Sequence, residues 1–528
     1  MENNNRNNYW IPIVMASCLA LGLYLGNVLT PSTVATQSLG ESRYQKMQDV
    51  IQILDQRYVD SVDSEGLFER TIGDMLHKLD PHSNYIPAKD LKAMNESLAG
   101  KFGGVGIRFF IIRDTVCVTN VLPNSPAMRA GLKSGDKILK VDGEKVARIK
   151  ISNEEIMGML KGTENTPVKL SILRDKKKLE KEVIRGSIPV ESVLAAYMVD
   201  SKIGFIKIEQ FSLATSYEFQ EAANRLKAQG MKKLIIDLRN NGGGVLTGAT
   251  EIANEFLKAN IPIVETKGVH SRPYTYKATS RGSLEDIEVA VLINSNSASA
   301  SEILAGAIQD NDRGTIIGRR SFGKGLVQED VMLRDGSNLR LTIARYYTPS
   351  GRCIQKPYTD DYDEYMSDQM GRYDNGELYK VDSTLLVDSL KFRTPKGKVV
   401  YGGGGIMPDI FVAYDTTGSS WYYTQLRYSN VFTTFAFDFV QGKRTSWKSP
   451  SDFKKRFVVT DEVLNRFTKF ATTEGKIKFE SKEFLISKKL IAEVLKAEIA
   501  RQIWVEQGYY QVYNDFDPEV QRAIRFFK

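Results

Sequence analysis

The sequence is poor in the residues that bind metals or form disulfide bonds. It contains three cysteines and three histidines among 528 residues. The cysteines, Cys18, Cys117 and Cys353, are far apart, so a disulfide framework is not expected. Neither they nor the histidines show the spacing of metal ligands. The sequence therefore predicts a protein without a metal site.

The sequence also lacks a strong excess of charge of one sign. Its 72 Lys and Arg against 64 Asp and Glu give a formal net charge of +8, with 26% of residues charged. This mild and evenly spread charge gives no reason to expect nucleic-acid binding. The chain is too long for one hydrophobic core, and its length predicts about three or four domains.

The N-terminal segment has no charged residue between positions 7 and 40, and residues 10–30 are mostly apolar. A run of about 20 apolar residues is long enough to span a bilayer. Arg6 and the terminal amine weakly favour a cytoplasmic N-terminus. We therefore expect residues 1–40 to be an uncleaved signal anchor, with a cleaved signal peptide or lipid attachment at Cys18 as alternatives. The rest of the chain is expected in the cell envelope, on the periplasmic side of the inner membrane.

The most informative stretch of the chain is residues 287–328. An apolar run at 287–293 predicts a buried strand, and the spacing after Glu302 predicts a helix. The serine-rich turn between them lies at a strand's carboxyl end, beside a helix N-terminus. Lys324 follows a second predicted strand and is flanked by glycines. A serine becomes a nucleophile when a base takes its proton, and lysine is a base only if its pKa falls from about 10.4 towards 7. A serine and a lysine alone are weak support, because serine turns commonly cap helices.

Two motifs make the interpretation specific. SASASE at 297–302 and FGKGLVQ at 322–328 resemble the carboxyl-terminal processing (tail-specific) peptidases, PDZ-containing serine proteases with a Ser–Lys dyad. The resemblance implies that Ser299 is the nucleophile, Lys324 the base and Gln328 the group that orients the lysine. It implies no cofactor. The neighbouring Ser297 and Ser301 fit turn or helix-capping roles.

A glycine-rich segment follows another predicted strand, at residues 234–238. Glycines there let backbone N–H groups approach a ligand closely, and the segment lacks the GKS/T ending of a phosphate-binding loop. It is similar to the LRxNxGG segment of the same family. That resemblance implies an oxyanion hole formed by Gly243, Gly244 and the N–H of Ala300.

Residues 102–185 resemble a PDZ domain, through FGGVGIRF at 102–109 and NSPAMRAGLKSGDKILKVDGEKV at 124–146. Such a module adds an extended peptide to a sheet edge and holds its terminal carboxylate in a loop. By this resemblance the loop consists of Gly103, Gly104, Val105 and Gly106, and Ile107 begins the edge strand. The alternative is a structural module that binds nothing.

The resemblance covers about residues 44–412 and implies a multidomain α+β protein with an α/β core of the crotonase and Clp-peptidase type. The expected parts are the signal segment 1–40, an N-terminal helical segment 41–98, an inserted PDZ domain 99–186, a protease core 187–415 and a C-terminal helical domain 416–528. Within the core, 358–398 is expected to be an insertion, and its acidic, tyrosine-rich part at 358–379 is expected to be exposed. LDPHSNYI at 79–86 is similar to a family motif, in which we expect His82 to cap or pack.

The implied function is a serine endopeptidase that cleaves proteins at or near their C-termini, with the PDZ domain selecting tails or gating the site. The expected partners are protein or peptide tails and the membrane, but not nucleic acid; a homo-oligomer is left open. One rival is a Ser–His–Asp hydrolase that pairs Ser299 with His77, His82 or His270. The other is a non-enzymatic PDZ adaptor on an inactive protease scaffold.

Overall fold

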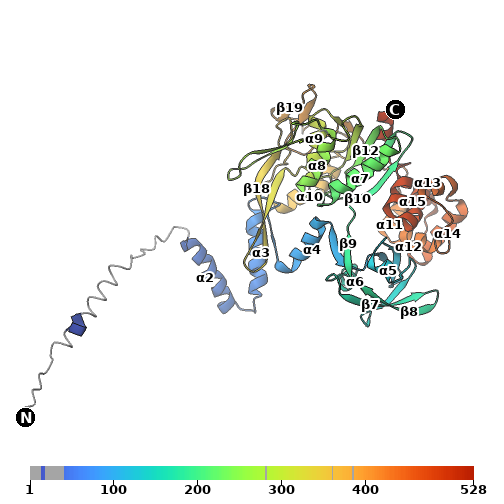
Figure 1. Ribbon diagram of the computed structural model, residues 1–528, viewed down its shortest axis with the longest axis horizontal. Coiled ribbons are helices and arrows are strands. Elements are labelled where there is room, and N and C mark those ends of the chain that lie inside the picture. The colour runs from blue at the N-terminus through green and yellow to red at the C-terminus, as the bar shows by residue number, and fades with distance from the viewer. Residues whose placement is uncertain (1–13, 18–40, 280–281, 360, 383, 385) are drawn as a thin grey trace, which may run out of the picture. The chain divides into compact units, whose positions relative to one another are not determined.

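The computed structural model describes residues 14–17, 41–279, 282–359, 361–382, 384 and 386–528 (Figure 1). The chain divides into two compact units, residues 1–76 and 77–528. Helices α2 (Glu41–Arg57) and α3 (Ser64–His77) confirm the helical pattern predicted for the start of the chain. The predicted signal anchor lies outside the described residues, apart from 14–17. Within the described ranges, no helix has the length and apolar character needed to cross a bilayer.

A six-stranded sheet forms the centre of the second unit, in the order β10-β11-β12-β15-β16-β21. All its neighbouring strands are parallel except the antiparallel edge pair β10 and β11. The apolar runs predicted as buried strands are confirmed, because central parallel strands are covered on both faces. The strands are β10 (Val193–Met198), β11 (Ile203–Ile208), β12 (Lys233–Asp237), β15 (Glu288–Ile293), β16 (Gly314–Gly318) and β21 (Ile410–Phe411).

Helices cover both faces of this sheet. One face packs against α7 (Thr215–Ala228), α8 (Leu246–Phe256) and α9 (Ala300–Asp310). Alternate residues of the same strands, which point to the opposite face, pack against α16 (Pro518–Phe527). The end of the chain was expected to belong to an appended domain, and α16 differs because it completes the core. Helix α16 packs against strands that are about 200 residues or more away in sequence. Local periodicity does not reveal such a contact.

The other helices of the C-terminal region surround an aromatic core of their own. The helix predicted for 421–440 is two helices, separated at residues 429–430, and the predicted 484–504 helix continues to residue 513 with a kink at Trp504 and Val505. Gln507 joins this region to the sheet through hydrogen bonds to the backbone of Ala196. The helices are α11 (Trp421–Tyr428), α12 (Val431–Phe439), α13 (Pro450–Arg456), α14 (Asp461–Thr473) and α15 (Ser481–Tyr513).

Residues 107–184 form a separate sheet in the order β3-β4-β5-β7-β8, with β6 paired to β5. Strand β3 lies at its edge, and α6 begins with the predicted capping box of Ser152 and Glu155. A two-stranded ribbon of β2 (Lys101–Gly104) and β9 (Gly186–Pro189) brackets the module. Its elements are β3 (Ile107–Ile111), β4 (Val116–Val121), α5 (Pro126–Arg129), β5 (Lys137–Val141), β6 (Glu144–Lys145), α6 (Asn153–Leu160), β7 (Pro167–Arg174) and β8 (Lys177–Ile184).

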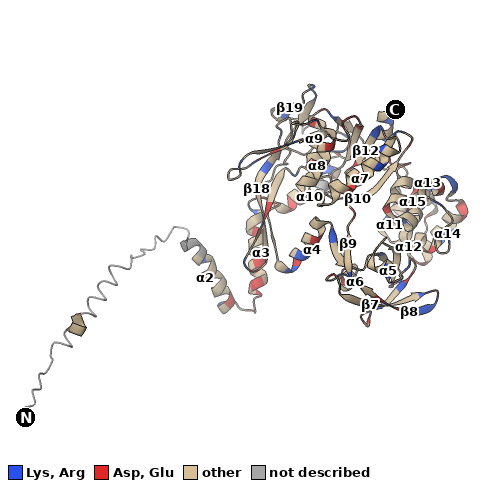
Figure 2. Ribbon diagram, viewed as in Figure 1, with Lys and Arg blue, Asp and Glu red and all other residues tan. Residues whose placement is uncertain are grey.

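A further sheet places residues from before this module beside the lysine loop. Strand β1 (Asn84–Ile86), which precedes α4 (Ala88–Ala99), pairs with β18 (Asn338–Tyr347), and β18 also pairs with β17 (Leu326–Met332). The predicted hairpin after residue 328 is thus confirmed but begins earlier. The remaining elements are β13 (Pro262–Lys267), β14 (Tyr274–Lys277), α10 (Tyr362–Asp374), η2 (Asp388–Leu390), β19 (Lys391–Arg393) and β20 (Val399–Tyr401). Lys and Arg are interspersed with Asp and Glu over the second unit (Figure 2), as the small net charge implies.

Candidate active site

Ser299 lies between strand β15 and helix α9, as the sequence predicts. It immediately precedes the helix with φ 56° and ψ −114°, a conformation that is rare for a residue with a side chain. Strained backbone of this kind persists where surrounding contacts enforce it, and it is concentrated at functional sites. Two neighbours supply such contacts: the Ser297 hydroxyl donates to Leu238 O (2.8 Å), and the Ser301 hydroxyl donates to Asn241 O (2.9 Å). The turn roles predicted for these two serines are therefore confirmed.

The carboxylate of Glu302 connects this turn to the lysine loop. One oxygen accepts from the N–H of Ser299 and of Lys324, both at 2.8 Å. The other accepts from the Ser321 hydroxyl at 2.5 Å and the Gly323 N–H at 2.7 Å. The side chain is fully buried, and burial raises its pKa while the four donors oppose the rise. This role was not predicted from the sequence, although a glutamate three residues after a serine is the pattern of a capping box.

Lys324 is held from two directions. Its Nζ donates to Gln328 Oε1 at 3.0 Å, and Gln328 in turn donates to the carbonyl oxygen of His82. The Tyr346 hydroxyl contacts the carbonyl oxygens of both Ser299 and Lys324. The backbones of the two residues are therefore held together, although no hydrogen bond joins Ser299 Oγ to Lys324 Nζ among the described contacts.

The environment of Lys324 favours the neutral amine. Burial lowers the pKa of Lys324, because a charged ammonium loses its hydration there, and the positive charge of Arg340 lowers it further. The carboxylates of Asp80 and Glu302 act in the opposite direction. The hydrogen-bond acceptor of the amine is an uncharged amide. The site can thus supply a lysine that takes up a proton.

The predicted oxyanion-hole residues are only partly brought together. Gly243 has φ 98°, and a Cβ there would lie 2.7 Å from Ala298 O and 2.8 Å from Ser299 Cβ, so the glycine lies directly against Ser299. Its N–H, however, donates to Asn241 Oδ1 at 2.9 Å. The N–H of Ala300, in the first turn of α9, makes no hydrogen bond among the described residues.

Gly244 is placed by a different contact. It pairs with Phe211, and a Cβ at this glycine would lie 2.0 Å from Phe211 O. Close backbone packing therefore accounts for this glycine. The role of Asn241 was missed, because an asparagine inside a glycine-rich turn is commonly a turn residue.

The three histidines do not form a triad with Ser299. Burial, and next the charge of Lys324, lower the pKa of His82 to about 3, so its imidazole is neutral. Its Nε2 lies 3.0 Å from the Tyr365 hydroxyl, which confirms the packing role. His77 stacks on Tyr362 with ring centroids 4.0 Å apart, and His270 is exposed. None of them makes a hydrogen bond to Ser299 among the described residues, so the geometry does not support the Ser–His–Asp rival.

Most described residues of the acidic, tyrosine-rich segment at 358–379 are exposed, as expected, but a few of its side chains are buried. Residues 362–374 form helix α10, in which Tyr365 is 5% and Arg372 1% exposed. Composition does not reveal these two side chains, because they are buried against hydrogen-bonding partners far away in sequence.

The predicted peptide-binding loop of the PDZ module differs in part. Gly103 and Gly104 belong to strand β2 and pair with β9, so only Val105 and Gly106 connect β2 to β3. Gly106 has φ 80°, a conformation that suits glycine. Ile107 begins β3, which is the edge strand as expected.

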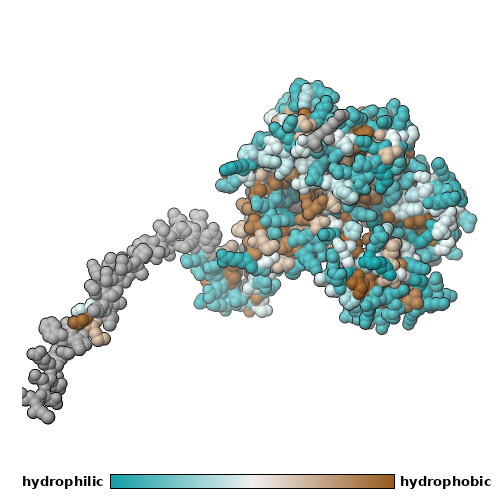
Figure 3. All heavy atoms as spheres, viewed as in Figure 1, coloured by the Kyte–Doolittle hydropathy of each residue, from teal (hydrophilic) through white to brown (hydrophobic). Residues whose placement is uncertain are grey.

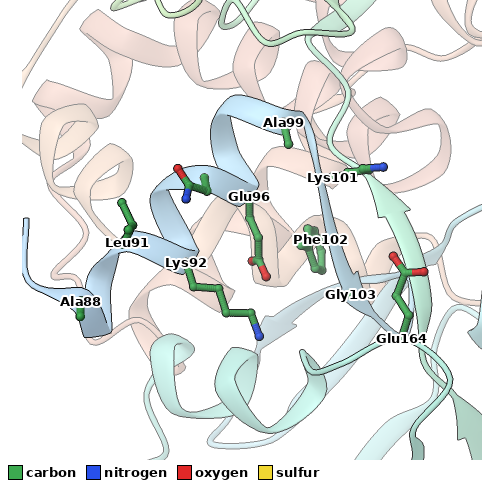
Figure 4. Close-up of a pocket in the computed structure, with 10 residues that line it drawn as sticks. Ala88, Leu91, Lys92, Glu96, Ala99, Lys101, Phe102, Gly103 and Glu164 are labelled. Carbon is green, nitrogen blue, oxygen red and sulfur yellow. The ribbon is translucent and has the colours of Figure 1, made fainter. Parts of the chain in front are cut away.

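A cavity of about 590 Å³ lies apart from Ser299, between α4 and β2 (Figure 4). In the face drawn in Figure 3, apolar side chains gather around this part of the second unit. Of the predicted site residues, only Gly103 lines the cavity, so this cavity is not the catalytic centre. Its lining residues are Ala88, Leu91, Lys92, Asn95, Glu96, Ala99, Lys101, Phe102, Gly103 and Glu164.

Comparison with known proteins agrees with this geometry. The description "Peptidase family S41" matches residues 202–363, a PDZ domain matches 103–184, and a family of unknown function matches 422–505. A carboxy-terminal-processing protease of Bartonella bacilliformis is 38% identical over 314 residues, which cover 58% of this chain and 71% of that protein. The chain belongs to peptidase family S41. It is a serine-type protease of the carboxy-terminal-processing kind, with a PDZ domain.

Two further proteins are similar over a comparable part of the chain. A probable CtpA-like serine protease of Staphylococcus aureus is 34% identical over 316 residues, 60% of this chain and 63% of that protein. The chain thus spans less than two thirds of the length of this relative. The solved structure of a photosystem II D1 C-terminal processing protease is 25% identical, covers 70% of this chain and 93% of its own, and has a TM-score of 0.35.

The contact between Gly243 and Ser299 can be tested by substituting Gly243, with its neighbour Gly242 as the control. Gly243→Ala places a methyl group within 3 Å of Ser299 Cβ and of backbone atoms of Ala298 and Ala300, in a φ region that alanine avoids. We expect it to lower kcat about 100-fold or more, because the oxyanion hole loses its geometry. Gly242→Ala meets nothing within 4 Å, so its kcat is expected to stay within about twofold of wild type. Steady-state cleavage of a fluorogenic peptide measures both, and equal rates for the two variants would contradict the assignment.

Proposed function

We propose that this S41 peptidase hydrolyses proteins at or near their C-termini with Ser299 as nucleophile and Lys324 as general base. The observation that carries the proposal is that the buried carboxylate of Glu302 accepts a hydrogen bond from the backbone N–H of both residues. This carboxylate fixes the two loops relative to each other, and positioning of reacting groups accounts for a large part of catalysis.

In the proposed mechanism, neutral Lys324 takes the proton of Ser299 as its oxygen attacks the scissile carbonyl. The Ala300 N–H, joined by the Gly243 N–H when Asn241 releases it, stabilises the resulting oxyanion. Lys324 then returns the proton to the leaving amine. Water, deprotonated by the same lysine, hydrolyses the acyl-enzyme. Gln328 orients the amine throughout through its hydrogen bond to Nζ.

The dyad is tested by substitution and by pH. Ser299→Ala and Lys324→Ala are expected to lower kcat about 100- to 10,000-fold, the usual contribution of such groups. Lys324→Arg keeps the charge but cannot deprotonate, so it is expected to be equally inactive. Because the pKa of Lys324 is lowered, activity should rise with pH as the ammonium loses its proton, with a midpoint below the ordinary lysine value of about 10.4.

The measurement is kcat/KM for a fluorogenic peptide across pH. Turnover by Ser299→Ala equal to that of wild type would refute the nucleophile. Activity retained by Lys324→Arg would refute the base. A protein that binds tails and shows no Ser299-dependent turnover would be the adaptor instead.

We also propose that the PDZ domain recruits substrate tails along the free edge of β3, with the terminal carboxylate at Val105 and Gly106. A substrate ending in a carboxylate is then cleaved with a KM about tenfold lower than the same substrate amidated at its C-terminus, because the amide carries no charge for the loop to bind. A short peptide that reaches only Ser299 serves as the control and should show no difference. Equal KM values for the amidated and free protein substrates would reject tail recruitment.

The location proposed for the protein is the cell envelope, anchored by residues 10–30 with the protease on the periplasmic side of the inner membrane. The support is the apolar sequence of that segment. Full-length chain expressed in a Gram-negative bacterium is expected in the membrane fraction after a carbonate wash, and a chain lacking residues 1–40 in the soluble fraction. Recovery of the full-length chain in the soluble fraction would contradict the anchor, and N-terminal sequencing would reveal cleavage.

A further inference from the structure

Helix α10 binds the loop that carries Lys324 through the carbonyl oxygens of that loop. The Arg372 guanidinium donates to three successive carbonyl oxygens, those of Arg320 (3.2 Å), Ser321 (2.9 Å) and Phe322 (3.1 Å). Its Nε donates to Asp368 on the same helix at 2.9 Å. Arg372 is 1% exposed, so water does not compete for these bonds.

Tyr365, two turns before Arg372 on the same helix, reaches Lys324 by two routes. Its hydroxyl lies 3.0 Å from His82 Nε2, and the carbonyl of His82 holds Gln328, the partner of the lysine amine. The same hydroxyl accepts from Gln355 Nε2 at 3.0 Å, and Gln355 Oε1 accepts the N–H of Gly325, the residue after Lys324, at 2.8 Å.

Lys356 closes the space between the helix and the loop. Its Nζ donates to Tyr365 O at 2.8 Å and pairs with Asp368 at 3.2 Å. It lies 3.9 Å from the ring centroid of Tyr365 and 4.2 Å from that of Phe322. A cation between two aromatic rings is a stable and largely dry contact. Directly after the helix, Glu377 forms two hydrogen bonds with Arg320, at 2.6 and 2.7 Å.

We propose that α10 is a strap that positions the catalytic base, with Arg372 and Tyr365 as its positioning residues. The proposal rests on the proposed Ser–Lys mechanism and adds the requirement that α10 hold the lysine loop in place. The match to the S41 family ends at residue 363, so nearly all of this helix lies beyond the matched segment.

The strap acts by keeping the lysine loop closed and dry. The charged groups that face Lys324 are Arg340 from β18, and Asp80 and Glu302 from the segments packed beside it. These charges remain when the strap is weakened, but water then reaches the amine and restores its hydration. The pKa of Lys324 then rises. A rise of about one unit leaves about tenfold less neutral lysine at any pH below this pKa.

The test uses isosteric changes on one helix. Tyr365→Phe removes only the hydroxyl, and Tyr373→Phe, the same change at a residue that is 54% exposed, is the matched control. Tyr365→Phe is expected to lower kcat about tenfold at pH 7, to move the pH midpoint upwards by about one unit, and to change KM for a short peptide less than twofold. Arg372→Met is expected to show a larger shift, partly rescued in Arg372→Lys. Tyr373→Phe is expected to match wild type.

Amide hydrogen exchange of residues 320–325, measured in a Ser299→Ala background, reports on the strap without using activity. Exchange is expected to be faster with Tyr365→Phe or Arg372→Met than with Tyr373→Phe. The strap is refuted if exchange and pH midpoint equal those of the control, or if kcat falls equally at every pH. If wild type shows no Ser299-dependent turnover, the proposed function fails, and the exchange result alone then decides whether α10 holds the loop.

Discussion

The active site depends on one buried carboxylate. Glu302 is fully buried, yet each of its oxygens accepts two hydrogen bonds from the Ser299 turn or the lysine loop. A buried carboxylate without such donors is strongly destabilising, so the hydrogen bonds from the two loops offset the cost of its burial. The same contact helps to hold the strained backbone of Ser299.

The lysine loop is held by opposite charges on its two sides. The carboxylate of Glu302 accepts hydrogen bonds from the N–H groups of the loop, and the guanidinium of Arg372 donates to its carbonyl oxygens. Because each ion is bonded to backbone dipoles, neither needs to pair directly with Lys324. The lysine can therefore lie between two buried ions and keep an uncharged hydrogen-bond partner, Gln328. This separation is compatible with the proposed role of Lys324 as a base in a site rich in charge.

Much of the fold and the centre of the site could be predicted from local sequence. Apolar runs and helical spacing give the strands and helices around Ser299, and the two short motifs give Lys324 and Gln328. Several missed features share a cause: each is a polar group buried by a partner distant in sequence. The missed roles of Glu302 and Asn241 differ, because their contacts include near neighbours in the chain. Arg372 and Tyr365 contact residues 320–322 and 82, and Arg239 in the core pairs with Asp517 in front of α16. Composition marks such residues as surface, and only the tertiary structure shows that their charges and hydroxyls are satisfied.

The hydrogen bond from Gly243 to Asn241 fits an enzyme that stabilises the transition state more than the substrate. A hydrogen bond between neutral groups contributes about 1 kcal/mol net, whereas an oxyanion-hole donor contributes about 2.7–4 kcal/mol to the transition state. A neutral substrate carbonyl therefore cannot outcompete the Asn241 oxygen for the Gly243 N–H by much, but a developing oxyanion can. In the proposed mechanism the donor changes partner as charge appears on the substrate, so its energy lowers the barrier and does not tighten ground-state binding. Asn241, which also accepts the Ser301 hydroxyl through its carbonyl, keeps the glycine aligned until that moment.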